Sequence, residues 1–174
     1  GQFPFSRDIY ADWLNSSPEN NAYVFNMGFT EADRFGKDSD LAEAMGTRDV
    51  ILSSFVSNKS QGDKPPRGFG KLGKGDPSDW LYSYKGMRTS VVAQYAEGVG
   101  AVTVAPSVDG IVRESPLAIL ANQHLWPSIA LEILRVWEFQ PNLAIKIKEA
   151  GVEWVRMGTL PPMYTTPNSN VQIA

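Results

Sequence analysis

The strongest local signals lie in one part of the chain, which reads Gly98-Val99-Gly100-Ala101-Val102-Thr103-Val104, then Asp109-Gly110, then Ile111 to Leu117, and finally Trp126-Pro127-Ser128-Ile129-Ala130-Leu131-Glu132-Ile133-Leu134-Arg135. Asp-Gly between two β-rich runs favours a tight hairpin turn, because glycine adopts positive φ without a steric cost. Pro127 fits the first turn of a helix. Apolar residues then recur at helical spacing, at Ile129, Ala130, Ile133, Leu134 and Trp137. The stretch therefore predicts a hairpin at Asp109-Gly110 that delivers an amphipathic helix onto its own sheet.

The composition fits one α/β domain with a buried core, since the chain has 174 residues and domains commonly run to roughly 100–200. Hydrophobic residues make up 43% of the chain and charged residues 20%, which indicates neither disorder nor a coiled coil. The formal net charge of −3 argues against a nucleic-acid partner. The absence of cysteine excludes disulfides, Cys-ligated zinc, iron–sulfur clusters and Cys nucleophiles. No apolar run is long enough for a membrane-spanning helix.

The N-terminal third has the pattern of a parallel crossover unit. Residues 22–29 predict a buried strand that Asn26 interrupts. Asp38 and Asp40 supply helix caps ahead of a short apolar helix, and residues 50–56 predict a second buried strand. Strand, helix and strand within about thirty residues predict a parallel βαβ unit.

Residues 57–90 are rich in glycine and proline and predict a long loop, a feature that is usually functional or disordered. Gly68 to Gly73 has the G-x-G-x-x-G spacing of a dinucleotide site, but no helix signal follows it to receive a pyrophosphate. The loop also has a basic excess, formed by Lys59, Lys64, Arg67, Lys71 and Lys74. These cations could attract an anionic ligand or a lipid headgroup, although a solvated loop is the favoured interpretation.

The C-terminal third predicts a second hairpin, because residues 143–148 and 153–157 alternate apolar and polar side chains around Ala150-Gly151. The predicted fold class is therefore α/β. It has a mixed sheet with an N-terminal parallel βαβ unit, a central Asp-Gly hairpin followed by a packed helix, and a C-terminal hairpin. We expect a single domain over residues 1–174. Because Gly1 is not an initiator Met and residues 171–174 resemble a strand cut short, we expect a piece of a longer protein.

Few residues form a catalytic or metal-binding pattern. His124 is the sole histidine and no Gly-x-Ser-x-Gly elbow is present, so neither a Ser-His-Asp triad nor an imidazole metal site is expected. An acidic cluster could hold a hard cation, but its last two members are accounted for as helix caps; it consists of Glu31, Asp33, Asp38 and Asp40. Arg113 either pairs with a carboxylate or points at a ligand. We predict no catalytic residue, no metal and no cofactor.

Several of these motifs together resemble the second family of CHASE domains, which are extracellular sensory domains associated with cyclases and histidine kinases. The resemblance rests on Asp109-Gly110, Arg113, Pro116-Leu117 and Pro127-Ser128 with Ala130. It extends upstream over Gly98 to Gly100 and over residues 7–14, 22–29, 38–42 and 50–52, and so covers nearly the whole chain. Asn26 stands where that family usually has an acidic residue. The resemblance implies an extracytoplasmic sensor with a cytoplasmic cyclase or kinase output, and it supplies no catalytic residue.

We therefore predict a non-catalytic sensory or ligand-binding module that lies in the periplasm or outside the cell as part of a membrane receptor. Asn26, Asp33 and Arg113 are the predicted ligand contacts, because they are polar residues near predicted strand ends. The expected partner is a small molecule or a protein, a homodimer is an expected assembly, and the membrane is reached only through flanking segments.

The rival hypothesis is a structural or protein-interaction module in a larger assembly, such as a virion or cell-surface complex, which would be soluble or virion-associated. A small hydrolase or transferase is the least favoured hypothesis, since no nucleophile can be paired with a base.

Overall fold

The computed structural model of the protein describes residues 14–16, 23–25, 38–59, 64–103 and 109–173. The first sheet contains four strands, β1 (Tyr23–Phe25), β2 (Val50–Ser57), β5 (Gly86–Arg88) and β6 (Gly98–Val102). β1 and β6 run parallel to β2, whereas β5 is antiparallel to it. Because helix α2 (Asp38–Gly46) joins β1 to β2, the predicted parallel βαβ unit is confirmed. Within these ranges, no helix is long and apolar enough to cross a membrane.

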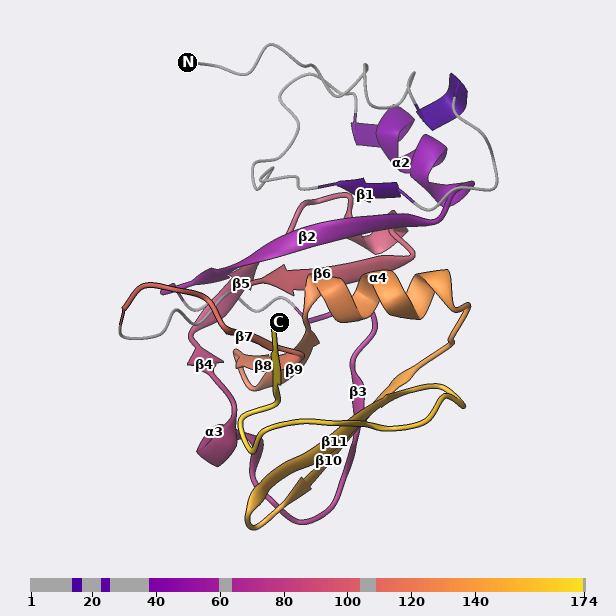
Figure 1. Ribbon diagram of the computed structural model, residues 1–174. Coiled ribbons are helices and arrows are strands. Elements are labelled where there is room, and N and C mark those ends of the chain that lie inside the picture. Colours follow the sequence, from indigo (N-terminus) through magenta and orange to yellow (C-terminus); the bar gives the residue numbers. More distant parts are fainter. Residues whose placement is uncertain (1–13, 17–22, 26–37, 60–63, 104–108, 174) are drawn as a thin grey trace.

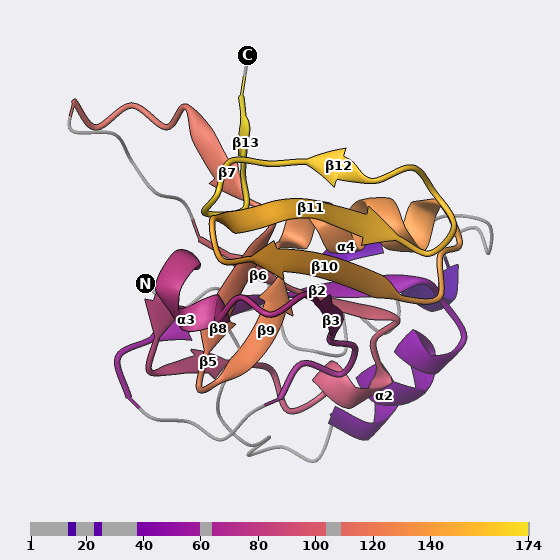
Figure 2. The same ribbon diagram turned by 90° about the horizontal axis from the view of Figure 1, so that it is seen from below.

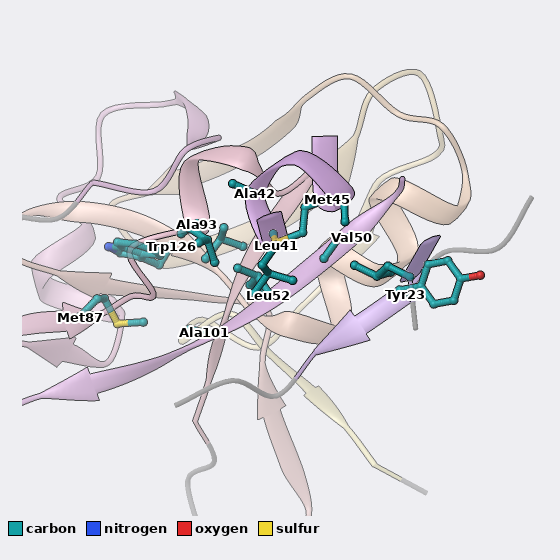
Figure 3. Close-up of a cluster of buried hydrophobic side chains, with 14 of the residues drawn as sticks. Tyr23, Leu41, Ala42, Met45, Val50, Leu52, Met87, Ala93, Ala101 and Trp126 are labelled. Atoms are coloured by element: carbon teal, nitrogen blue, oxygen red, sulfur yellow. The ribbon is translucent and has the colours of Figure 1, made fainter. Parts of the chain in front are cut away.

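The first hydrophobic core lies between α2 and the first sheet (Figure 3). Leu41 and Met45 are four residues apart and fully buried, so they lie on the same face of α2. Val50 and Leu52, two residues apart on β2, point to the same face of the sheet and join this core. Helical and strand periodicity thus predicted the contact between these two elements.

Helix α4 (Ile129–Trp137) covers the opposite face of this sheet (Figure 1). Val99 and Ala101 belong to the core beneath α2, so the alternate residues of β6, Gly98 and Gly100, face α4. A Cβ on Gly100 would lie 2.4 Å from the Cα of Ile129. Glycine is therefore required for the close approach of strand and helix backbones.

The start of α4 differs from the prediction. Pro127 is the last residue of strand β9 (His124–Pro127) and does not lie in the first helical turn. Ser128 is the N-cap residue, and its Oγ accepts a hydrogen bond from the backbone N–H of Leu131 at 3.2 Å. The Ser128 side chain thus satisfies the N–H of Leu131, which has no carbonyl partner within the helix because it lies in the first turn.

Strands β8 (Ala118–Ala121) and β9 form a hairpin that contributes to two cores, and β4 (Ser83–Tyr84) pairs with β8. Ile119 and Trp126 belong to the first core, whereas Ala118 belongs to a second one. Asn122 and Gln123 connect the strands, both with positive φ, as a two-residue primed turn requires. This hairpin was not predicted from the sequence, since neither turn residue is glycine.

The second core lies beneath another four-stranded sheet, which has the strand order β12-β11-β10-β3. Its strands are β3 (Phe69–Leu72), β10 (Leu143–Lys148), β11 (Gly151–Met157) and β12 (Met163–Tyr164). β10 and β11 pair antiparallel, so the predicted C-terminal hairpin is confirmed. This sheet lies at the end of the molecule away from β1 and α2 (Figure 1).

The turn at Asp109-Gly110 is present, but the strand pairing predicted across it is wrong for the described residues. Gly110 has φ +78°, and the backbone N–H of Ile111 donates to the Asp109 carboxylate. Strand β6 pairs with β2, and strand β7 (Glu114–Pro116) pairs with β13 (Asn170–Gln172). Local hydrogen bonds hold this turn without the support of two flanking strands.

The predicted loop over residues 57–90 is also structured in part. It contains β3, the short helix α3 (Pro77–Trp80), β4 and β5, and a 3₁₀ turn (Ala93–Tyr95) follows. Asp76 caps α3 by accepting from the N–H of Ser78 at 2.9 Å. A Cβ on Gly73 or Gly75 would lie 2.2 Å from a backbone oxygen of β10. Both glycines therefore allow close packing. No helix begins at the end of the G-x-G-x-x-G run, since the four-residue α3 starts only at Pro77, so the run does not form a dinucleotide site.

Candidate functional site

Helix α4 buries a charged pair and exposes apolar side chains. Glu132 is 0% exposed and Arg135 is 1% exposed, and Leu131 and Val136 are buried beside them. Leu134 is 45% exposed and Trp137 is 67% exposed. The prediction that the stripe containing Leu134 and Trp137 faces the sheet is therefore wrong, and the buried charges become the main candidate for a functional site.

The Arg135 guanidinium is almost fully bound by hydrogen-bond acceptors. Its Nε donates to Glu132 Oε2 at 2.8 Å, and its Nη2 lies 2.7 Å from the same oxygen. Nη2 also donates to the backbone oxygen of Glu97 at 2.7 Å, and Nη1 donates to that of Gln140 at 3.0 Å. Arg135 thus fastens α4 both to the start of β6 and to the link that leads into β10.

A second arginine extends this pair to the surface. The Arg67 Nη2 donates to Glu97 Oε1 at 2.8 Å, and its Nε donates to the Glu97 backbone oxygen at 3.2 Å. The Glu97 carboxylate also lies 3.8 Å from Arg135 Nη1. Four side chains of alternating charge, Arg67, Glu97, Arg135 and Glu132, therefore run from solvent into the interior. We call them the charge relay.

The absence of a side chain at Gly98 leaves the space that the charge relay occupies. A Cβ at this position would lie 2.6 Å from Glu132 Oε2 and 3.2 Å from Arg135 Nη2. Any larger residue would therefore displace the ion pair. The position of Glu132 and Arg135 in the first and last turns of α4 also matches the helix dipole, which favours an anion at the N-terminal end and a cation at the C-terminal end.

Burial raises the pKa of the Glu132 carboxyl above its ordinary value, and desolvation is the largest cause. The hydrogen bond from Arg135 and the positive charges of Arg135 and Arg67 oppose this rise, whereas the negative charge of Glu97 adds to it. Glu132 Oε1 is buried and has no hydrogen-bond partner among the residues described. The protonation of Glu132 is therefore coupled to the placement of Arg135, which Glu97 helps to fix.

This arrangement is suited to coupling rather than to catalysis. Carboxylates and guanidinium groups are present, but no nucleophile paired with a base is found in the charge relay. In the part of the chain with a described structure, no group of three or more His, Cys, Asp or Glu residues could hold a metal ion. At the exposed end, an external anion could replace Glu97 as the partner of Arg67, or an external cation could replace Arg67 as the partner of Glu97.

Of the three predicted ligand contacts, only Arg113 lies in a described part of the chain. Its Nη1 and Nη2 donate to the two carboxylate oxygens of Asp109, at 2.9 and 2.7 Å. Both side chains are about half exposed, and the hydrogen bond from Arg113 is the largest cause of a lowered Asp109 pKa. Asn26 and Asp33 lie outside the described residues. A ligand role for these three residues stays a prediction.

Glu97, Glu132 and Arg135 were not predicted as functional residues from the sequence. A signal was present, because Glu132 and Arg135 are three residues apart between the apolar residues Leu131 and Val136. Charges at this spacing lie on one helix face with their apolar neighbours. The glycines on alternate positions of β6 were a second signal, because they leave a smooth strand face against which such a helix can pack.

Comparison with known proteins gives one match. The family model of the CHASE2 domain matches residues 1–172, essentially the whole chain. No curated protein and no solved structure matches the chain.

Proposed function

The chain belongs to the CHASE2 domain family of sensory domains, and from this premise we propose that it is a non-catalytic extracytoplasmic sensor of a signal-transduction receptor. A cyclase or kinase output would lie elsewhere in the protein. We propose further that a ligand acts at the exposed end of the charge relay and that α4 carries the response. The observation that supports this proposal is the chain of contacts from Arg67 through Glu97 and Arg135 to Glu132, in which the Glu97 carboxylate lies 3.8 Å from Arg135 and the Glu97 carbonyl accepts a hydrogen bond from it.

The two ends of the charge relay differ in how easily they can change. Arg67 and Glu97 have side chains that are 43% and 39% exposed, and exposed ion pairs contribute roughly 0–1 kcal/mol. A ligand carboxylate or phosphate could therefore replace Glu97 as the partner of Arg67 at little cost. At the buried end, displacement of the Glu97 carboxylate would remove its ionic contact with Arg135 Nη1 at 3.8 Å, while the hydrogen bond from Arg135 to the Glu97 backbone oxygen would remain. A weak surface exchange would thus alter a tightly held helix.

A thermal-shift screen tests this function. Carboxylates, amino acids, phosphates and nucleotides are added to the wild-type chain, and each hit is retested on Arg67→Gln and on Lys64→Gln. Lys64 is an exposed cation in the same segment and serves as the matched control. We expect a hit to raise the melting temperature of the wild type and the control, but not of Arg67→Gln. Hydrogen exchange over residues 129–137 should change when the hit binds.

Two outcomes would contradict this site. A hit that stabilises Arg67→Gln as much as the wild type binds elsewhere, and retesting it on alanine variants of Asn26, Asp33 and Arg113 would show whether it binds at the contacts predicted from the sequence. A hit that requires Arg67 but leaves the exchange of α4 unchanged would argue against α4 as the responding element.

A structural or protein-interaction module is the second candidate function. Three exposed apolar side chains favour it: Leu134 and Trp137 on α4, and Phe139 two residues after the helix, which is 85% exposed. Sedimentation velocity of the wild type and of Trp137→Gln with Phe139→Gln tests it. Concentration-dependent association that the double variant abolishes would support this function, and a monomer at every concentration would argue against self-assembly.

A further inference from the structure

The sheet of β3, β10, β11 and β12 has an outer face that points away from the second core, and Figure 2 looks onto it. Ile145 and Val155 are fully buried in that core, so their neighbours Lys146 and Trp154 point outward. The strand register places one outward residue of each strand in a single row, Leu72, Lys146, Trp154 and Tyr164. The row is roughly 14 Å wide at the usual strand spacing.

This face combines exposed apolar, aromatic and cationic side chains. Leu72 is 46% exposed and Tyr164 is 74% exposed. Lys146 Nζ lies over the Trp154 ring at 5.9 Å from its centroid, and Arg156 Cζ lies over it at 5.4 Å. We call this surface the Trp154 face.

The Trp154 face is more positive than the chain as a whole. Lys146, Lys148 and Arg156 are cations, and Glu153 is the carboxylate between them, at 2.9 Å from Lys146 Nζ and 2.6 Å from Lys148 Nζ. The pKa of Glu153 is lowered chiefly by its hydrogen bonds from these two lysines, first Lys148 and then Lys146. The cations outnumber the carboxylate here, although the whole chain has a net charge of −3.

We propose that the Trp154 face docks onto the surface of an anionic phospholipid bilayer. Lysine and arginine beside a bilayer are attracted to anionic headgroups. Tryptophan and tyrosine combine an apolar ring with a polar group and therefore favour the water–lipid boundary. Leu72 adds an apolar side chain at the edge of the row. The charge of this face thus complements the headgroups.

An acidic glycan fits the same charges less well. Sugar rings bind aromatic residues by stacking on the open face of the ring, but Lys146 and Arg156 lie over the ring of Trp154. The bound cations leave their remaining N–H groups available for phosphate oxygens. We therefore assign the face to lipid headgroups, and an acidic polysaccharide becomes an outcome of the test.

Co-sedimentation with vesicles tests the proposal. The probes are phosphatidylcholine vesicles with and without one third of phosphatidylglycerol, at low and at high salt. We expect the 174-residue chain to bind the anionic vesicles at low salt and to dissociate at high salt. The double variant Lys146→Gln with Arg156→Gln should bind about 25-fold more weakly, because each cation contributes about fivefold. Glu153→Gln should bind about fivefold more tightly.

A matched control removes the same charge from other surfaces. Lys59 follows β2 and Lys85 lies between β4 and β5, and both are exposed. The double variant Lys59→Gln with Lys85→Gln should retain anionic-vesicle binding within about twofold of the wild type. The melting temperature of each variant shows whether it is folded. The tighter vesicle binding of Glu153→Gln counts as support only if this variant melts at the same temperature as the wild type.

Three results would overturn the proposal. The first is the absence of binding to anionic vesicles at low salt. The second is an equal loss in the face variant and the control, which would mean that only net charge matters. The third is binding to dextran sulfate, without binding to vesicles, that depends on Lys146 and Arg156, which would assign the Trp154 face to acidic polysaccharides.

Discussion

Helix α4 and the β10–β11 hairpin are both amphipathic, but they are oriented in opposite ways. The hairpin points Ile145 and Val155 into a core and Lys146 outward, as its alternating sequence predicts. The helix points Glu132 and Arg135 inward and exposes Leu134. Periodicity therefore shows which residues share a face, whereas the neighbouring element decides whether that face is buried.

The neighbours of the two elements explain the contrast. The hairpin packs against apolar side chains of the second core, including Leu117 and Leu131. Helix α4 packs against Gly98 and Gly100, which bring a backbone rather than side chains to the contact. The carbonyl of Glu97, the residue before β6, accepts a hydrogen bond from Arg135. The polar face of α4 is therefore satisfied at the backbone, since Arg135 shares the Glu97 carbonyl with Arg67.

The largest effect should come from Arg135→Ala, which breaks the contrast by removing the buried cation. We expect a loss of about 3–5 kcal/mol in the free energy of unfolding, because Glu132 would remain buried without its partner. Urea denaturation measures this loss. The matched substitution on the other element is Lys146→Ala, whose partner Glu153 stays in contact with water and with Lys148. Its effect should be far smaller.

The double variant Arg135→Met with Glu132→Leu sharpens this prediction. Removing both charges leaves no unpaired ion, so the double variant should be more stable than Arg135→Ala. An Arg135→Ala variant as stable as the wild type would show that the ion pair is not buried. A double variant that is less stable than Arg135→Ala would show that the backbone contacts of Arg135 matter more than the charge of Glu132.

The parts of the fold that local patterns determine could be predicted from the sequence. Alternation around Ala150-Gly151 identified the β10–β11 hairpin, and helical spacing identified α2 between β1 and β2. Other features depend on distant partners. Strand β7 pairs with β13 through Ser115 and Val171, and neither segment carries a signal for the other. A turn with positive φ at Asn122 and Gln123 lacks the glycine that would have marked it.

The candidate site was less predictable than the fold for a related reason. Arg113 was predicted as a ligand contact because it lies near a predicted strand end, and the structure pairs it with Asp109, which is one of the two alternatives that the sequence left open. Charged residues within a helix usually lie on its solvent face, so Glu132 and Arg135 did not stand out. Only the glycines of β6, together with the position of α4 on them, show that these charges are buried.

An intermediate effect should come from Gly98→Ala, which tests the space beneath the charge relay. The new Cβ would lie 2.6 Å from Glu132 Oε2, so the ion pair or the helix must shift. We expect a loss of about 1–3 kcal/mol in the free energy of unfolding. Gly46→Ala is the control, since a Cβ at this last residue of α2 meets nothing within 4 Å and its φ is not positive, so alanine fits without strain. Equal stabilities of the two variants would contradict the close approach of α4 to β6.

The smallest effect should come from Leu134→Gln, and it decides which face of α4 is buried. Leu134 belongs to the apolar stripe that the sequence predicted to face the sheet, but its side chain is 45% exposed. Glutamine keeps a similar helix propensity, so the free energy of unfolding should change by no more than about 0.5 kcal/mol. Leu131→Ala, at a fully buried position of the same helix, should lose about 2–5 kcal/mol. If chemical denaturation gave the reverse order, α4 would be rotated so that its apolar stripe meets β6, and the charge relay could not form.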